Sequence, residues 1–158
     1  MKIAIVSDTH NNWLNFKKAI DWIKKEKISV ILHCGDINSQ EMVDESRKHF
    51  SEGVIHFVRG NGDYGLDVPE KMELELDNRK VSFCHFPDSA KKMAQSGKYD
   101  VVFYGHTHRP WDEKVACPAM GECHMINPGE LAGHFYKPSF AVYDTTTGML
   151  ELKILENL

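Results

Sequence analysis

Several features that define other classes of protein are missing from this sequence of 158 residues. No segment approaches the roughly 20 consecutive apolar residues that a membrane-spanning helix needs, and the apolar run from Ile3 is interrupted at Ser7, too early for a secretion signal. Internal repeats, low-complexity tracts and linker-like segments are also absent. We therefore expect a soluble, cytoplasmic protein that folds as a single domain over residues 1–158.

The sequence also lacks an excess of basic charge. It has 19 Lys and Arg against 23 Asp and Glu, which gives a formal net charge of −4. Nucleic-acid-binding domains usually show a strong basic excess, so we expect no general nucleic-acid binding. The chain is also too short for a TIM barrel, which needs about 250 residues.

Cysteine is scarce, and no CxxC pair occurs among Cys34, Cys84, Cys117 and Cys123. Without a secretion signal we expect these thiols to be reduced. A disulfide between Cys117 and Cys123, or a zinc site that combines them with His124, is the alternative.

Short apolar runs and amphipathic segments alternate along the first half of the chain, and the second half is rich in strand-like runs. Strands are predicted at 2–6, 29–33, 54–58, 71–76, 80–84 and 101–104 and around 115, 124–126, 140–143 and 150–155, with helices from 11 or 12 to 27, 38 to 49 and 88 or 89 to 97. Asn11 or Asn12 is the expected N-cap of the first helix, and Asn38 with Glu41 resembles a capping box for the second. The pattern predicts an α/β fold, a sandwich of two mixed sheets flanked by helices.

Potential metal ligands follow five of the predicted strands. They are Asp8, His10, Asp36, Asn61, His85, His106 and His108. In open α/β folds the carboxyl ends of the strands line the ligand crevice, so these side chains are expected to share one site. Glycines at 35, 60 and 105 precede three of them and would let the loops approach closely.

The number of candidate ligands indicates the kind of site. Seven exceed the four that structural zinc uses and suit two cations that share one bridging ligand. Asp8 and His10 are spaced to lie on the same side of an extended segment, as are His106 and His108. Asp36, alone in its loop, is the natural bridge. Oxygen and nitrogen donors without thiolate suit Mn, Fe, Co, Ni or Zn.

Five short motifs occur in a fixed order. They are Asp8-Thr9-His10, Gly35-Asp36, Gly60-Asn61-Gly62-Asp63, Cys84-His85 and Gly105-His106-Thr107-His108, with Asn127-Pro128-Gly129 further along. This order resembles the calcineurin-like metallophosphoesterases, and within them the small single-domain phosphodiesterases. The resemblance implies that one metal is held by Asp8, His10 and His108 and the other by Asn61, His85 and His106, that Asp36 bridges them, and that Mn is the favoured metal.

Two positions depart from the family pattern. Gly62 stands where larger members carry a histidine thought to protonate the leaving group, and Glu130 replaces the serine common after Asn-Pro-Gly, which puts a phosphate-binding role for that loop in doubt. His124 and His134 are candidates for the missing proton donor. His33 is a candidate support for the ligands, and Asp63 is a candidate to orient a ligand loop without touching metal. Arg109 is expected either to clamp a phosphate or to form a surface ion pair.

The resemblance implies a dinuclear phosphoesterase, most simply a phosphodiesterase, in which a metal-bridging hydroxide attacks a small phosphoester. Asp36, Asn61 and His106 are the predicted catalytic residues. The alternative is a non-catalytic scaffold of the same fold that binds other proteins, and a hydrolase of amides or lactones is a second rival. Assembly into a homo-oligomer is left open.

Overall fold

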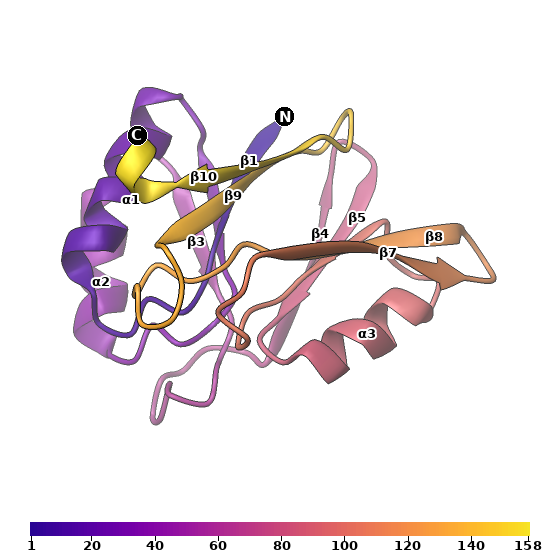
Figure 1. Ribbon diagram of the computed structural model, residues 1–158, viewed down its shortest axis with the longest axis horizontal. Helices are drawn as coiled ribbons and strands as arrows, with labels where there is room; N and C mark the ends of the chain where they lie inside the picture. Colours follow the sequence, from indigo (N-terminus) through magenta and orange to yellow (C-terminus); the bar gives the residue numbers. More distant parts are fainter.

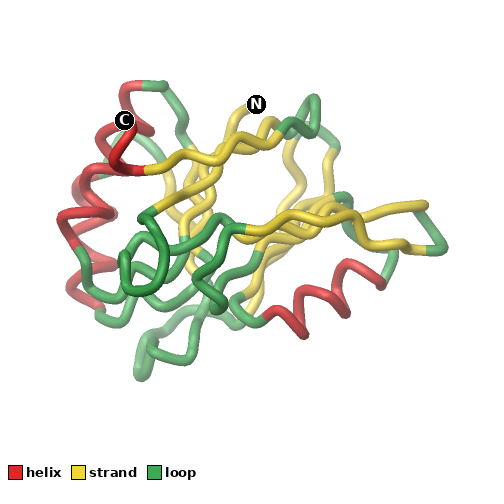
Figure 2. The backbone as a smooth tube through the Cα atoms, viewed as in Figure 1, coloured by secondary structure: helices red, strands yellow, loops and turns green.

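The computed structural model describes residues 1–158 and places two five-stranded sheets face to face, with helices on both outer sides (Figures 1 and 2). The elements in chain order are β1 (Lys2–Val6), α1 (Trp13–Lys25), β2 (Val30–His33), α2 (Gln40–His49), β3 (Val54–Phe57), β4 (Lys71–Leu76), β5 (Arg79–Cys84), α3 (Pro87–Gln95), β6 (Val101–Phe103), β7 (Trp111–Cys117), β8 (Gly121–Asn127), β9 (Ser139–Asp144), β10 (Leu150–Ile154) and a 3-10 turn, η1 (Leu155–Asn157). The predicted α/β sandwich of two mixed sheets is confirmed.

Each sheet combines parallel and antiparallel pairs. The first has the order β10-β9-β1-β2-β3, and the second has the order β4-β5-β6-β8-β7. Strands β1, β2 and β3 run parallel, as do β5, β6 and β8. The carboxyl ends of the parallel strands therefore share one edge in each sheet, which is where the candidate ligands follow.

The alternation of side chains along the strands creates four layers. In β1, Ile3 and Ile5 belong to the apolar cluster between the sheets, whereas Ala4 and Val6 pack in the cluster that includes the buried side of α1 and α2. A third cluster, under α3, contains Ala90 and Ala94. Because successive strand side chains point to opposite faces, a fully apolar strand such as β1 must be covered on both sides.

Helix α1 forms largely as its sequence predicts. Asn12 is the N-cap and accepts a hydrogen bond from the Asn15 N–H at 3.1 Å. Phe16, Ile20 and Ile23 form the buried stripe. The helix ends at Lys25 rather than at the predicted residue 27, because Lys27 adopts a left-handed conformation with φ of 57°.

Two predicted helix starts are wrong. The N-cap of α2 is Ser39, whose hydroxyl accepts from the Met42 N–H, rather than Asn38, whose N–H donates to Asp63. Helix α3 begins at Pro87, before the predicted residues 88 or 89. Proline suits the first helical turn because its missing N–H has no intrahelical partner there.

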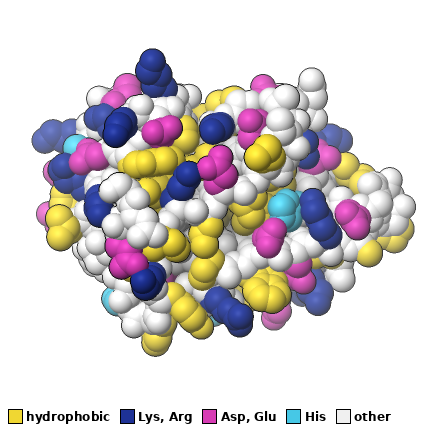
Figure 3. Space-filling model, turned by 45° about the horizontal axis from the view of Figure 1, so that its top comes forward, with side chains coloured by type: hydrophobic (Ala, Val, Ile, Leu, Met, Phe, Trp, Pro, Cys, Tyr) yellow, Lys and Arg dark blue, Asp and Glu magenta, His cyan; other side chains and the backbone are white.

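The four cysteines are buried and unpaired, so the alternative disulfide between Cys117 and Cys123 is not formed. No helix is both long enough and apolar enough to cross a lipid bilayer. On the face drawn in Figure 3, basic and acidic side chains are intermixed.

Replacement of Phe103 by alanine tests the packing between the sheets. This fully buried ring belongs to the inter-sheet cluster, so its loss should lower the free energy of unfolding by about 3–5 kcal/mol. The matched Phe135→Ala, at a side chain 78% exposed, should change it by no more than about 0.5 kcal/mol. Urea unfolding measures both, and similar costs for the two variants would contradict the layered core.

Candidate metal centre

The structure brings all seven predicted ligand side chains to one place. They come from the loops that follow β1, β2, β3, β5 and β6, and are Asp8, His10, Asp36, Asn61, His85, His106 and His108. The first three loops belong to one sheet and the last two to the other. The site therefore spans both sheets.

One group of donor atoms surrounds Asp8. Its Oδ1 lies 3.3 Å from Nε2 of His108 and 3.8 Å from Nε2 of His10, and the two imidazole nitrogens are 3.3 Å apart. Asp8 is fully buried, and its Oδ1 has no hydrogen-bond partner. A buried carboxylate oxygen without a donor is costly, so this atom calls for a positive partner.

A second group surrounds Asn61. Its Oδ1 lies 3.1 Å from Nε2 of His85 and 3.0 Å from Nδ1 of His106, and these two nitrogens are 3.3 Å apart. His85 is fully buried, whereas Asn61 and His106 are exposed to solvent. This group therefore forms the open side of the site.

The carboxylate of Asp36 lies between the two groups. Its Oδ2 is 3.6 Å from Nε2 of His10 and also 3.6 Å from Nε2 of His85. Its Oδ1 faces away and accepts a hydrogen bond of 2.7 Å from the Gly62 N–H. Oδ1 is thus held by a backbone hydrogen bond, and Oδ2 lies close to both donor groups.

The backbone brings paired ligands together in a way that the sequence analysis did not predict. Instead of extended segments, Asp8, His10, His106 and His108 each have a left-handed conformation, with φ of 51°, 45°, 69° and 61°. Side chains with a Cβ visit this region rarely, although Asp and His do so more than most. The sharp turns let each loop fold back over the end of its strand, which an extended loop would not do.

Two glycines allow the loops to approach one another. A Cβ built on Gly105 would lie 2.0 Å from the Ser7 hydroxyl oxygen, and one on Gly60 would lie 2.2 Å from Oδ1 of Asp36. Neither position has space for a methyl group. The predicted role of these glycines, close approach of ligand loops, is confirmed.

Two buried histidines have the same tautomer, set by their hydrogen bonds. Nδ1 of His85 donates to the carbonyl oxygen of Cys34 at 2.8 Å, and Nδ1 of His108 donates to Oε2 of Glu130 at 2.9 Å. Each Nε2 therefore presents a lone pair to the centre of the site. This arrangement is how proteins usually orient metal-binding imidazoles.

Glu130 is a functional residue whose role the sequence analysis did not identify. Besides His108, its carboxylate accepts backbone N–H bonds from His134, Phe135 and Tyr136 at 2.7–2.9 Å. Burial acts to raise the pKa of Glu130, but these donors together hold it below its usual value. The only signal in the sequence was an acidic residue directly after the Asn-Pro-Gly turn.

Asp63 orients the loop around Asp36. Its Oδ2 accepts from the N–H groups of Asp36 and Gly60 at 2.8 and 2.7 Å, and its Oδ1 accepts from the Asn38 N–H at 2.7 Å. All of its close contacts are with backbone amides. This is the loop-orienting role predicted for Asp63.

Burial dominates the electrostatics of the site. It raises the pKa of Asp8 to about 7, against the opposing effects of the Ser7 hydroxyl and of His108. It also lowers the pKa values of His10 and His85, against the opposing charge of Asp36. Imidazoles that resist protonation keep a lone pair available to a cation, and a bound cation would in turn favour the ionised form of the Asp8 carboxyl.

His33 is not part of either donor group, but it holds the loops that carry the ligands. It is fully buried, lies 2.7 Å through Nε2 from the Thr9 hydroxyl, and accepts at Nδ1 from the Gly35 N–H at 3.2 Å. It thus joins the loop of Asp8 and His10 to the loop of Asp36. Burial lowers the pKa of His33 to about 4.

The remaining candidates separate clearly. His124 interacts with Asp112 on the neighbouring strand, at 3.1 Å, and takes no part in either donor group. The guanidinium of Arg109 lies over the Trp111 ring, 5.1 Å from its centroid, and forms no ion pair. His134 lies beside the first donor group, with its ring centroid 5.1 Å from that of His10.

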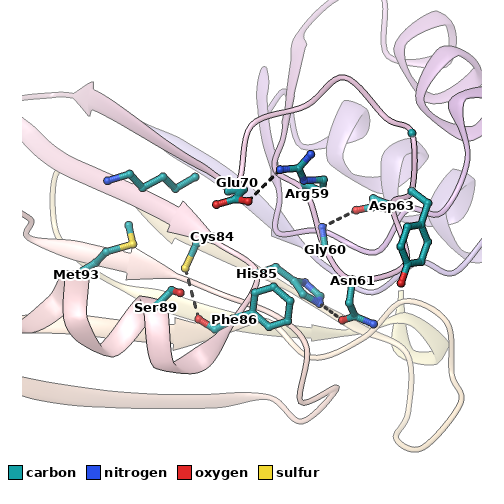
Figure 4. A pocket seen from close by; sticks show the side chains of 13 residues that line it. Arg59, Gly60, Asn61, Asp63, Glu70, Cys84, His85, Phe86, Ser89 and Met93 are labelled. Atoms are coloured by element: carbon teal, nitrogen blue, oxygen red, sulfur yellow. Dashed lines mark hydrogen bonds and ion pairs between the residues drawn. The ribbon is translucent and has the colours of Figure 1, made fainter.

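A cavity of about 550 Å³ opens beside the second donor group (Figure 4). Asn61 and His85 lie at its edge, and its walls carry charges of both signs, including Arg59 ion-paired with Glu70 at 3.0 Å. The ring of Phe86 is 41% exposed, and its centroid lies 5.0 Å from that of His85. The cavity thus combines an aromatic surface with the donor atoms.

Two facing mixed sheets with an Asp, Asn and His cluster at their strand ends form the metallophosphoesterase fold. The chain belongs to the calcineurin-like phosphoesterase superfamily, whose domain model matches residues 1–148. It is 32% identical to the phosphodiesterase MJ0936 of Methanocaldococcus jannaschii, over 92% of this chain and 93% of that protein.

Solved structures agree with this assignment. An archaeal phosphodiesterase superposes with a TM-score of 0.84 at 29% identity, covering 98% of this chain and 99% of that one. Vps29 of Chaetomium thermophilum has a TM-score of 0.73 at 20% identity, over 96% and 86% of the two chains. The second likeness is one of fold.

The neutral, buried His33 predicts how stability depends on pH. Its pKa rises from about 4 in the folded protein to an ordinary 6.5 on unfolding, so the unfolded state binds the proton more readily. Stability should therefore fall by about 3 kcal/mol as the pH is lowered from 6.5 to 4, at about 1.4 kcal/mol per pH unit.

Urea unfolding of His33→Gln over this pH range measures the effect. The variant should be less stable at neutral pH but should lose less stability on acidification than the wild type. His49→Gln, which removes a histidine paired with Asp21 on the outer side of α1 and α2, is the comparison and should not reduce the loss of stability on acidification. Parallel curves for wild type and His33→Gln would show that His33 is not held neutral.

Proposed function

We propose that this protein is a dinuclear metal-dependent phosphodiesterase. In this proposal Asp8, His10 and His108 hold one divalent cation, Asn61, His85 and His106 hold the second, and Asp36 bridges them. The observation that carries it is the position of Asp36 Oδ2, 3.6 Å from a nitrogen of each donor group. The other carboxylate among the predicted ligands, that of Asp8, lies close to histidines of the first group alone.

The spacing of the donor atoms supports the proposal. Metal bonds to nitrogen and oxygen of about 2.0–2.2 Å, at tetrahedral or octahedral angles, place neighbouring ligand atoms about 2.8–3.6 Å apart. Five of the six separations within the two groups, from 3.0 Å between Asn61 and His106 to 3.3 Å between His10 and His108, fall in this range. The sixth, 3.8 Å between Oδ1 of Asp8 and Nε2 of His10, is slightly longer. The fixed tautomers of His85 and His108 already direct a lone pair inward.

When bound, a pair of divalent cations would lower the pKa of coordinated water and stabilise charge on the attacking and leaving oxygens of an in-line displacement. The chain itself supplies the positions. Asp63 and Gly62 hold the loop of Asp36, Glu130 orients His108, and no side chain is required as a covalent nucleophile. Asn61 and His106, at the exposed side, are placed to meet the phosphoester.

The cavity beside Asn61 favours a diester over a monoester. A phosphodiester carries a second organic group, and about 550 Å³ of space beside the donor atoms can receive it. Phe86 offers an apolar surface there against which that organic group can pack. We further propose a cytoplasmic location, in keeping with the unpaired thiols, and Mn as the favoured metal by family resemblance.

The alternative of a non-catalytic scaffold does not require these donors. Nothing in a protein-binding surface would demand a buried Asp8 with an orphaned oxygen or two inward-facing imidazoles. The complete donor set is the reason for preferring an enzyme. Metal analysis, with and without chelator, and a screen of phosphodiesters and phosphomonoesters test that choice.

Replacement of Asp36 by asparagine tests the bridge. The variant keeps the shape but loses an anion shared by both positions, so the metal content should fall below two per chain and kcat/KM for an aryl phosphodiester should fall by at least about 100-fold. His108→Ala, which removes one ligand of one cation, should lose less. Asp44→Asn, on the exposed side of α2, is the control.

Mass-spectrometric metal analysis and steady-state hydrolysis on the same preparations provide the measurement. If Asp36→Asn keeps the wild-type turnover and binds two metal ions per chain, the assignment of Asp36 as the bridge is wrong.

The glycine at position 62 predicts a dependence on the leaving group. Without a histidine there, no dedicated acid assists departure, and such assistance is typically worth about 10²–10⁴-fold in rate. Aryl phosphodiesters should be cleaved well and alkyl esters poorly, with a steep decline as the leaving-group pKa rises. A series of substituted phenyl esters measures the slope.

A shallow slope would reveal another proton donor. His134 would then be the first residue to replace, because His124 lies outside the donor groups. Gly62→His is a less direct test than the sequence suggests. A Cβ at position 62 would lie 2.4 Å from Oδ1 of Asn38, so that side chain must first move.

A further inference from the structure

His134 lies against the first donor group although it belongs to none of the motifs. One ring nitrogen from each of His10, His108 and His134 lies within 4.8 Å of the other two. The His134 ring is tilted by 31° to the His10 ring and by 26° to the His108 ring. Three imidazoles therefore gather at this position, whereas the second donor group has two.

The position of His134 is set by the same carboxylate that orients His108. The backbone N–H of His134 donates to Oε2 of Glu130 at 2.9 Å, and Nδ1 of His108 donates to that oxygen at 2.9 Å. Glu130 is fully buried, and its other oxygen holds the next two backbone amides. The backbone at His134 is thus rigidly tied to one of the proposed ligands.

The imidazole of His134, in contrast, is exposed and makes no hydrogen bond with the protein. Neighbouring ligand atoms on one cation lie about 2.8–3.6 Å apart, so a separation of at most 4.8 Å must shorten by only about 1–2 Å. Rotation of the side chain about its own bonds can cover this difference. The backbone that Glu130 holds need not move.

We propose that His134 is an additional nitrogen ligand of the cation held by Asp8, His10 and His108, an inference that rests on the proposed function. A third imidazole would make this position richer in nitrogen than the one at Asn61. Imidazole suits Zn, Cu, Fe and Ni, whereas carboxylate, carbonyl and water ligands suit Mg, Ca and Mn. His134 should therefore favour Zn²⁺ and related ions over Mn²⁺ at the first position, so that the preference for Mn proposed above would apply to the second position alone.

Metal titration of the full-length protein tests the inference without any measurement of activity. His134→Gln removes the imidazole at an exposed position, so the fold should be kept. His49→Gln, the same change at a histidine on α2 outside the site, is the matched control. Zn²⁺ and Mn²⁺ are titrated separately, in competition with a chromophoric chelator, and the absorption spectrum of the Co²⁺-loaded protein reports coordination.

We expect His134→Gln to weaken Zn²⁺ at one of two sites by about 10–100-fold, the loss typical for disruption of a metal-binding shell, and Mn²⁺ by less. The Co²⁺ spectrum should change in His134→Gln and stay unchanged in His49→Gln.

Two Zn²⁺ ions bound with wild-type affinity and an unaltered Co²⁺ spectrum in His134→Gln would overturn the ligand role and leave the proposed function intact. An equal loss of Zn²⁺ and Mn²⁺ affinity would overturn the selectivity. A wild-type protein that binds neither ion would refute the proposed function itself, and the ligand role with it.

Discussion

The structure depends on the convergence of two buried carboxylates, Asp8 and Asp36, at a point that no lysine or arginine reaches. Burial raises the pKa of Asp8 to about 7, and one of its oxygens has no donor. Such a site is unfavourable for a protein by itself, because desolvated anions need compensation. Bound cations would supply that compensation, so the same feature that weakens the metal-free fold would create affinity for metal.

The ligand loops adopt strained backbone conformations, and hydrogen bonds from neighbouring residues hold them in place. Left-handed backbone at Asp8 and His106 turns the loops sharply, and such conformations persist only where the surroundings enforce them. Asn127 supplies part of that enforcement, since its amide donates to the Gly105 carbonyl and its oxygen accepts from the Gly129 N–H. Hydrogen bonds to the backbone behind the ligand loops thus help to fix the positions of the ligand atoms that face the site.

The ordered elements and the donor set could be predicted from the sequence because both depend on local patterns. The continuous apolar run of β1 is typical of a strand buried on both faces, and the buried stripe of α1 follows from the helical period. The cap of α2 could not be predicted in the same way. Asn38 and Ser39 are both good N-caps by residue type. Ser39 is extended, as an N-cap usually is, whereas Asn38 has a left-handed backbone with φ of 78° and its side-chain amide lies 3.1 Å from Nδ1 of His10, which is distant in the sequence.

The sequence by itself determined which donor types exist, their order along the chain, and their placement at the ends of strands. Only the tertiary structure decided which atoms meet. Three contacts illustrate the difference. Glu130 accepts from His108, 22 residues earlier in the sequence, and His33 contacts Thr9, 24 residues earlier. His134 donates its backbone N–H to Glu130, 4 residues earlier but outside any helix. Such contacts leave no periodic trace in the sequence, because each involves a residue in a loop, and a loop has no repeating geometry from which its neighbours can be inferred.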